Sequence, residues 1–337
     1  MNWIEKILDN SDHILALSPM ADMTDSAFCQ VVREVGGADI VFREMVSSEA
    51  IVRDSEKTLG MTDFVPAERP IVQQIFGADP LTMAKAAEIV MERACPEGID
   101  INMGCPVYKL TSNFNGAALM KEPELAARIV SEMKRSIGET PLSVKIRLGW
   151  NDPDTFRTFI PVLEEAGAEL ITMHGRTKAA GYSGTSDWDR LREAKRIATV
   201  PFLANGDIHE PLQVWEVLRH TGADGVLIAR GALGNPWFFR SALALQDEKS
   251  TTDRRYIHIP MKERVHTILR HAELHTAQYG ERGIVTFRKH LSWYMKANKL
   301  GIEVPGIKDW RGRLVRVESL AELRDILTDF LGTIAKV

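Results

Sequence analysis

The sequence alternates eight times between short apolar runs and longer segments with helical periodicity, and this alternation most constrains the fold. The runs are rich in β-branched residues and recur every 25 to 40 residues, roughly as buried parallel strands do. The predicted strands are residues 14–19, 39–44, 70–76, 98–103, 142–148, 170–175, 200–206 and 225–231. Eight strand–helix units predict a closed parallel (β/α)8 barrel, the TIM-barrel fold. The alternative is an open doubly wound sheet, which usually has fewer strands and a glycine-rich fingerprint after the first strand, and none is present here.

The alternation stops after Gly231, and the remaining predicted elements are helices. A polar segment at 247–253 indicates a linker, so we expect a barrel domain over residues 1–245 and an all-helical domain over 246–337. Its predicted helices are 261–278, 284–299 and 320–334. The second of these is amphipathic. Its apolar face holds Ile284, Phe287, Leu291, Tyr294 and Met295, and its basic face holds Arg288, Ser292, Lys296 and Lys299.

Charge is divided unevenly along the chain. Residues 1–240 hold 25 Lys and Arg against 34 Asp and Glu, whereas residues 241–337 hold 17 against 12, which together give the net charge of -4. A basic C-terminal part on an acidic body is expected where one part of a protein meets a polyanion. The alternative is a solvated helical surface without a charged partner.

Composition excludes several classes of protein. A chain with 45% hydrophobic and 26% charged residues is too apolar for disorder. The N-terminal segment resembles neither a signal peptide nor a membrane span, so we expect a cytoplasmic protein without a membrane partner. Cys29, Cys95 and Cys105 lack CxxC spacing, so we expect reduced thiols and no metal site, with Cys29 and Cys95 buried and inert.

Polar side chains gather at the predicted C-terminal ends of the strands. In chain order they are Glu44, Gln74, Asn102 with Cys105, Lys145 with Arg147, His174 with Arg176, Asn205 with Asp207, and Arg230, while Pro19, Met20 and Ala21 follow the first strand. A purely structural barrel does not need amide, thiol, amine, imidazole and carboxylate groups at one end. This convergence predicts an active site at the mouth of the barrel.

Some of these groups indicate a particular ligand. The last two strands end in small-residue loops, Asn205-Gly206-Asp207 and Ala229-Arg230-Gly231, whose backbone N–H groups suit a phosphate. Lys145 lies within an apolar strand, so it needs an anion such as a reduced flavin, or an ion pair with Glu44 or Asp207. His174 suits either a core position or catalysis, and Cys105, directly after a strand, is a candidate nucleophile or acid.

These residues resemble a known family, the tRNA-dihydrouridine synthases. The signature loop is Asp100-Ile101-Asn102-Met103-Gly104-Cys105-Pro106, followed by Lys109 and Asn115-Gly116-Ala117-Ala118. Similar to the same family are Pro19-Met20-Ala21, Gln73-Gln74-Ile75, Val144-Lys145-Ile146-Arg147, His174-Gly175-Arg176-Thr177, Asn205-Gly206-Asp207, Gly234-Asn235-Pro236-Trp237, Phe287-Arg288-Lys289-His290 and Trp293-Tyr294. The resemblance covers nearly the whole chain, in the family's order.

The resemblance implies an FMN-dependent oxidoreductase that uses NADPH to reduce the C5–C6 double bond of particular uridines in tRNA, without an obligate protein partner. It implies flavin contacts from Pro19, Met20, Ala21, Gln74, Lys145, His174, Asn205, Gly206, Asp207, Ala229 and Arg230. Hydride would pass from the reduced flavin to uracil C6, and Cys105 would protonate C5 as general acid. Asn102 and Arg176 would orient the flipped-out base, and Arg288 and Lys289 would contact the tRNA.

Two departures from the family pattern are present. Ala229 precedes Arg230 where glycine is common, and the loop after Cys105 keeps only the second glycine of a Gly-x-Gly, Gly116.

Two other functions remain open. A flavin-dependent barrel that reduces a free pyrimidine or another enone would not need the basic helical domain. A non-catalytic tRNA-binding homologue would not need Cys105, Lys145 and His174.

Overall fold

Eight parallel strands close into one barrel, in which each strand pairs with the next along the chain and β8 pairs with β1. The computed structural model describes residues 2–107, 111, 115–246, 257–296, 304 and 306–334. The strands are β1 (Ile14–Leu17), β2 (Ile40–Ser47), β3 (Ile71–Phe76), β4 (Gly98–Asn102), β5 (Leu142–Arg147), β6 (Leu170–His174), β7 (Phe202–Asn205) and β8 (Gly225–Ile228). The predicted (β/α)8 barrel is confirmed. Only β2 runs beyond its predicted end, past an irregularity in its pairing with β3 between Arg43 and Val46.

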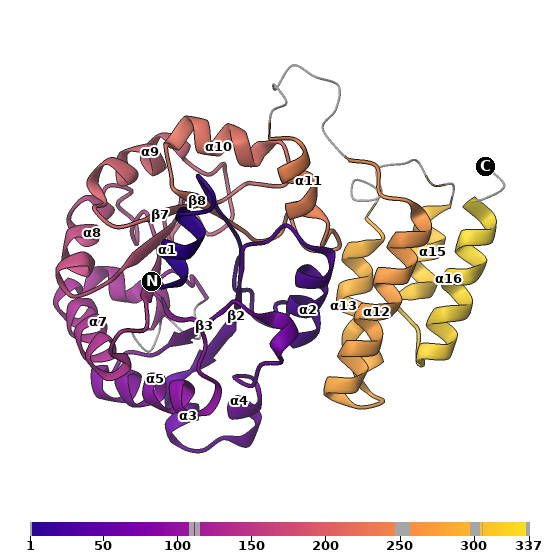
Figure 1. The fold of residues 1–337 in the computed structure, drawn as a ribbon, viewed down its shortest axis with the longest axis horizontal. Coiled ribbons are helices and arrows are strands. Elements are labelled where there is room, and N and C mark those ends of the chain that lie inside the picture. The colour runs from indigo at the N-terminus through magenta and orange to yellow at the C-terminus, as the bar shows by residue number, and fades with distance from the viewer. Residues whose placement is uncertain are drawn as a thin grey trace.

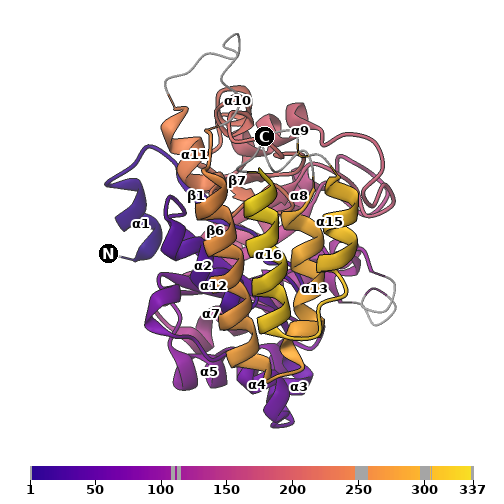
Figure 2. The same cartoon turned by 90° about the vertical axis from the view of Figure 1, so that its right-hand side faces the viewer.

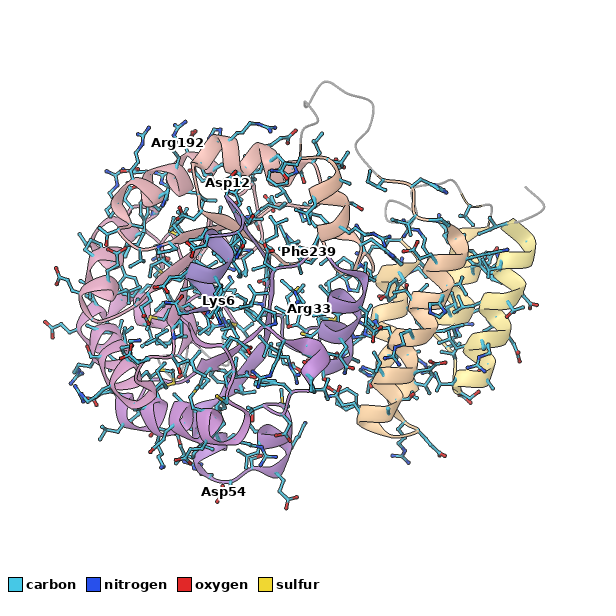
Figure 3. All side chains as sticks on the ribbon, viewed as in Figure 1. Lys6, Asp12, Arg33, Asp54, Arg192 and Phe239 are labelled. Atoms are coloured by element: carbon cyan, nitrogen blue, oxygen red, sulfur yellow. The ribbon has the colours of Figure 1, made fainter. Side chains whose placement is uncertain are left out.

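The strands are mostly apolar and buried along nearly their whole length, because both of their faces are covered. Helices cover the outside of the barrel, and side chains fill the space between ribbons (Figures 1 and 3). Inside, one hydrophobic cluster joins the first residues of several strands to Trp3 and Ile4 of helix α1 (Trp3–Leu8). Trp3 meets Phe42 edge to face, with ring centroids 6.3 Å apart. Helix α1 therefore closes the end of the barrel opposite the predicted mouth (Figure 1).

The helices around the barrel begin where the sequence supplies caps. Asp79 caps α5, with Pro80 in the first turn, and Asp187 caps α9. The helical elements are α2 (Ser26–Val35), α3 (Ser48–Val52), α4 (Glu56–Gly60), η1 (Pro66–Glu68), α5 (Pro80–Ala94), η2 (Gly116–Lys121), α7 (Pro123–Ile137), α8 (Phe156–Glu165), α9 (Trp188–Ile197), α10 (Gln213–Thr221) and α11 (Phe238–Ala244).

The C-terminal helices pack beside the barrel, against α2 (Figures 1 and 2). They are α12 (Met261–Tyr279), α13 (Gly283–Tyr294), α15 (Ile307–Leu314) and α16 (Leu320–Ile334). They share a hydrophobic cluster of their own, which Trp237 joins from the barrel side. The predicted boundary near residue 245 directly follows α11 and stays a prediction. No helix among the described residues is long and apolar enough to cross a membrane.

The sequence prediction for this part is wrong in two respects. Helix α13 ends at Tyr294, earlier than predicted, whereas the predicted end at Lys299 and the predicted linker at 247–253 lie outside the described residues. Helix α15 was not predicted, because its charged sequence and internal Gly312 give a weak apolar pattern. The predicted apolar face of α13 is confirmed, since Ile284, Phe287 and Leu291 are buried.

Candidate active site

A cavity of about 330 Å³ opens at the C-terminal ends of the strands, where the sequence predicts the mouth of the barrel. All of the residues predicted to bind the cofactor line this cavity: Pro19, Met20, Ala21, Gln74, Lys145, His174, Asn205, Gly206, Asp207, Ala229 and Arg230. Cys105 and Asn102 line it too. The structure therefore brings groups from distant parts of the chain into one site, because the ends of parallel strands meet at one rim.

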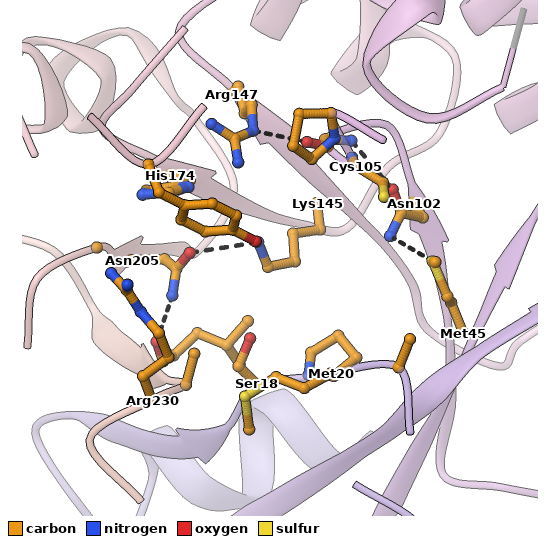
Figure 4. Close-up of a pocket in the computed structure, with 18 of the residues that line it drawn as sticks. Ser18, Met20, Met45, Asn102, Cys105, Lys145, Arg147, His174, Asn205 and Arg230 are labelled. Atoms are coloured by element: carbon orange, nitrogen blue, oxygen red, sulfur yellow. Dashed lines mark hydrogen bonds between the residues drawn. The ribbon is translucent and has the colours of Figure 1, made fainter. Parts of the chain in front are cut away.

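Lys145 extends from β5 into the middle of this cavity (Figure 4). Its Nζ donates a hydrogen bond of 3.2 Å to Oδ1 of Asn205, whose own Nδ2 donates to the Leu227 carbonyl oxygen at 2.6 Å. Burial lowers the pKa of Lys145 to about 8, and the positive charge of Arg147 acts in the same direction. Among the described residues no ion pair joins Lys145 to Glu44 or Asp207, so this amine is left to face a ligand.

The loop that carries Cys105 is fixed by the side chain of Asn102, at the end of β4. Its Oδ1 accepts hydrogen bonds from the backbone N–H of Cys105 at 2.9 Å and of Gly104 at 3.2 Å. The chain then returns close to Cys105. Gly116 has φ +59°, and a Cβ there would lie 2.9 Å from the Cys105 carbonyl oxygen. Glycine at this position is therefore required by both conformation and space.

A chain of buried hydrogen bonds sets the orientation of Asn102. Asp100 accepts from the Ser143 hydroxyl and from Gln74 Nε2, each at 2.6 Å. Gln74 Oε1 in turn accepts from Asn102 Nδ2 at 2.8 Å. In its ionised form Asp100 can only accept, so it fixes which end of the Gln74 amide faces it and, through Gln74, the Asn102 amide. Burial raises the pKa of Asp100 to about 7.

His174 is a neutral imidazole in the wall of the cavity. Burial, together with the positive charges of Lys145 and Arg147, lowers its pKa to about 2. Gly206, at φ +120°, lies so close that a Cβ there would approach the His174 ring to 2.7 Å. A neutral ring offers a hydrogen bond without charge, which suits an uncharged edge of a ligand.

Arg176 lies behind the cavity wall, where its Nη1 donates to Nε2 of the lining residue His174 at 3.2 Å. Its guanidinium donates two hydrogen bonds to the Asp207 carboxylate, at 2.7 and 2.9 Å, and others to the carbonyl oxygens of Ser183 and Gly184. Burial of Asp207 acts in the opposite direction, yet the hydrogen bonds from Arg176 lower the pKa of that carboxyl. Arg176 itself does not line the cavity, and its role in orienting a base stays a prediction.

Two residues of the site, Arg147 and Tyr182, were not predicted from the sequence to bind a ligand. Arg147 Nε donates to the Gly104 carbonyl oxygen at 2.7 Å, and its Nη1 donates to the Gly181 carbonyl oxygen at 2.9 Å. Tyr182, which is 63% exposed, lies at the rim, with the guanidinium groups of Arg147 and Arg230 5.7 and 5.1 Å from its ring centroid. Arg147 follows Lys145 by two residues in β5, so the two side chains lie on the same face of the strand, and this spacing could have identified Arg147 as a binding residue of the site. The loop that holds Tyr182 has no periodic pattern from which its place could be predicted.

The charged groups of the cavity wall favour an anion. Lys145, Arg147 and Arg230 bring three positive charges, and the one carboxylate among the described lining residues, Asp207, is neutralised by Arg176. The Arg230 side chain is 41% exposed, and its guanidinium also lies 3.6 Å from Asp207 Oδ1. The cavity therefore suits a molecule with a phosphate or another delocalised negative charge.

Two predictions concern residues outside this site. Arg288 donates to the carbonyl oxygens of Val317 and Arg316 at 2.9 and 3.0 Å, and Lys289 is partly exposed on the same helix, α13. Neither lines the cavity. Cys29 is buried as expected, but the expectation for Cys95 is wrong: this thiol is exposed, because Cys95 takes the left-handed position that ends α5.

The fold and the cationic mouth define a (β/α)8-barrel protein with a ligand site at the ends of its strands. The profile of the dihydrouridine synthase (Dus) family matches residues 15–334, and the chain belongs to this family. It is 34% identical to a probable tRNA-dihydrouridine synthase 1 from Synechocystis sp., over 94% of this chain and 86% of the relative. It is also 34% identical to tRNA-dihydrouridine synthase B from Pseudomonas aeruginosa, over 90% and 88% of the two chains.

Solved structures share the fold at low sequence identity. An old yellow enzyme homologue from Zymomonas mobilis is 13% identical, with a TM-score of 0.50 over 75% of this chain and 94% of that one. Histamine dehydrogenase from a Rhizobium species is 11% identical, with a TM-score of 0.56 over 94% of this chain and 62% of that one. At these identities the likeness concerns the barrel architecture alone.

Proposed function

We propose that this protein is a tRNA-dihydrouridine synthase, an oxidoreductase that reduces the C5–C6 double bond of uridines in tRNA. The observation that carries the proposal is the meeting of Cys105, Lys145 and His174, from three separate parts of the chain, in one cavity with a positively charged wall. Membership of the dihydrouridine synthase family and the names of the relatives support the same substrate.

The residues of the cavity suit FMN as the bound cofactor. Lys145 offers a cation in the middle of the site, and Arg230 offers an exposed guanidinium beside the glycine-containing loops after β7 and β8. This donor set matches a planar ring with a delocalised negative charge and a terminal phosphate. Pro19, Met20, Ala21 and Gln74 would hold the ring, and Asn205, Gly206, Asp207 and Ala229 would surround the rest of the cofactor. When bound and reduced by NADPH, FMN would supply the hydride for uracil C6.

Cys105 would supply the proton for C5. Its thiol would become a thiolate as the C5–H bond forms, and it would regain its proton from water, so the two hydrogens added to uracil come from a hydride and a proton. Asn102 holds the backbone of Cys105 and also lines the cavity, so it would orient both the acid and the base. This division of roles needs no further redox group from the protein.

The basic C-terminal helices would dock the RNA. A uracil inside folded tRNA must leave its stack to reach a barrel mouth, so the enzyme must hold the surrounding backbone while the base is flipped out. Lys289 and Arg288, on α13, are the predicted contacts of this part. An excess of positive charge in residues 241–337 supports this assignment.

The visible absorption spectrum of the purified protein tests the proposal. We expect a flavin spectrum that bleaches with NADPH in the absence of oxygen and returns when unmodified tRNA is added, with dihydrouridine appearing in the RNA. If free uridine or another small enone restores the flavin spectrum but tRNA does not, the tRNA assignment is overturned. A protein that cannot take up FMN would overturn the enzyme assignment altogether.

A further inference from the structure

A second group of polar side chains is buried outside the active site, between the start of α2 and the helices α12 and α13. Asp25 caps α2, where one carboxylate oxygen accepts from the backbone N–H of Phe28 at 3.0 Å. His271 and His275 follow at adjacent turns of α12, and His290 comes from α13. All four side chains are almost completely buried, with at most 2% of each residue exposed.

These four residues point polar atoms toward one another. His271 Nε2 and His290 Nε2 are buried without a hydrogen-bond partner, whereas Asp25 Oδ2 and His275 Nδ1 lie 3.0 Å apart and face each other. One donor atom from each of Asp25, His271 and His290 lies within 4.8 Å of the other two. Since an unpartnered buried polar atom costs about 1–3 kcal/mol, two unpartnered ring nitrogens beside a buried carboxylate call for a missing partner.

The other ring nitrogens show which atoms are free. His271 Nδ1 lies 3.1 Å from the Tyr294 hydroxyl. His275 Nε2 lies 2.8 Å from the Thr286 hydroxyl, which already donates its proton to the Gly283 carbonyl oxygen. His275 Nε2 must therefore donate to Thr286, which leaves Nδ1 of the same ring facing Asp25 Oδ2 at 3.0 Å.

An imidazolium–carboxylate pair is the alternative that needs no ligand. If His275 carried a second proton, it would neutralise Asp25, and the phenol of Tyr279 lies near the same carboxylate. This pair leaves His271 Nε2 and His290 Nε2 without partners.

We propose that this cluster binds one divalent transition-metal ion, best matched by Zn²⁺, through Asp25, His271 and His290. His275 Nδ1, 3.0 Å from Asp25 Oδ2, would move toward the ion and complete the set as the fourth ligand. Three imidazoles and one carboxylate form a common donor set for tetrahedral zinc, in which ligand atoms lie roughly 3.3 Å apart. The three atoms already within 4.8 Å of one another need only small ring rotations to reach that geometry.

The surroundings support a structural metal site. Tyr294 and Thr286 contact the remaining nitrogens of His271 and His275, as outer-shell partners of metal-bound histidines do. Four protein ligands leave no open position, which is typical of structural rather than catalytic zinc. The ion would join the barrel, through Asp25, to the C-terminal helices, through the three histidines.

The test measures zinc on the full-length protein, and it needs neither flavin nor tRNA. After treatment with a chelator and dialysis, we expect the protein to take up one Zn²⁺ per chain by elemental mass spectrometry. Its melting temperature should rise by roughly 5 °C or more when the free Zn²⁺ concentration is about 100 times the dissociation constant. X-ray absorption at the zinc edge should show only nitrogen and oxygen ligands, with histidine scattering.

Matched variants locate the site. His271→Gln and His290→Gln keep a polar side chain of similar length and should lose both the stoichiometric zinc and the rise in melting temperature. His266→Gln, on the exposed side of α12, should keep both. The proposal is overturned if the wild type retains no zinc after dialysis, or if the two variants retain as much as His266→Gln. If a variant fails to fold, the X-ray absorption spectrum of the wild type still tests the proposal. Zinc bound by sulfur, or mainly by water, would contradict the proposed ligands.

Discussion

Cys105 is the one cysteine among the described residues that lines the cavity, and its backbone is held by Asn102. We expect Cys105→Ala to bind flavin and to bleach with NADPH like the wild type. Its reoxidation by tRNA should be slower by about 10²- to 10⁴-fold, the usual contribution of a general acid. Cys95→Ser, which changes an exposed thiol at the end of α5, is the control and should turn over normally. An unchanged rate for Cys105→Ala in stopped-flow absorbance would remove the general-acid role.

His174 makes stability depend on pH. In the folded protein its pKa lies at about 2, whereas an ordinary histidine titrates near 6.5. The unfolded chain therefore binds a proton that the folded protein does not, and the free energy of unfolding falls as the pH drops below 6.5. Between pH 7 and pH 5 the wild type should lose about 2 kcal/mol more than His174→Gln, as urea unfolding at both pH values would measure. Equal losses in the two proteins would mean that His174 is charged in the folded state.

At the scale of elements, the loop between β4 and η2 is closed by Gly116 against Cys105. Gly222, at the end of α10, provides a comparison, because it too has a positive φ, +67°, in the left-handed region, yet a Cβ there would meet nothing within 4 Å. Alanine at either position should cost roughly 1–2 kcal/mol of stability in urea unfolding, through its left-handed backbone.

Only Gly116→Ala should also reduce turnover, by roughly 10- to 100-fold, because the new methyl group pushes the backbone of Cys105 out of position. Steady-state kinetics with tRNA measure this difference. If both variants turned over equally well, the close approach of Gly116 to Cys105 would have no part in catalysis.

At the scale of the whole molecule, we expect substitutions of two neighbouring cations of α13 to affect different properties: stability for Arg288 and tRNA binding for Lys289. Arg288 donates to the Val317 and Arg316 carbonyl oxygens, so Arg288→Ala should lower the free energy of unfolding by about 1–3 kcal/mol. Lys289→Ala should leave stability unchanged, weaken tRNA binding and reduce the slope of log Kd against log salt by roughly one. Lys85→Ala on α5, away from the C-terminal helices, is the control (Figure 1). Equal binding by Lys289→Ala and the control at low salt would place the RNA elsewhere.

The sequence predicts the barrel and most of the cavity wall, because each strand is a largely apolar run whose last residues must meet at one rim. It predicts neither the direction in which Arg176 turns, which depends on Asp207 in a later loop, nor the place of Tyr182 in an aperiodic segment. The His271 and His275 spacing on α12 is visible in the sequence, but its meeting with Asp25 spans more than half of the chain. Contacts of this kind arise only when separate elements pack.

The segment between β1 and α2 belongs to both parts of the molecule. Met20 lines the cavity, and its backbone N–H donates to the Thr24 hydroxyl at 2.8 Å. Asp25, the residue after Thr24, faces the histidines of α12 and α13. We therefore expect that the C-terminal helices cannot be grafted alone onto another barrel along a cut near residue 245. A working chimera would have to carry residues 19–25 together with those helices, so recombination between relatives should respect two crossover points rather than one.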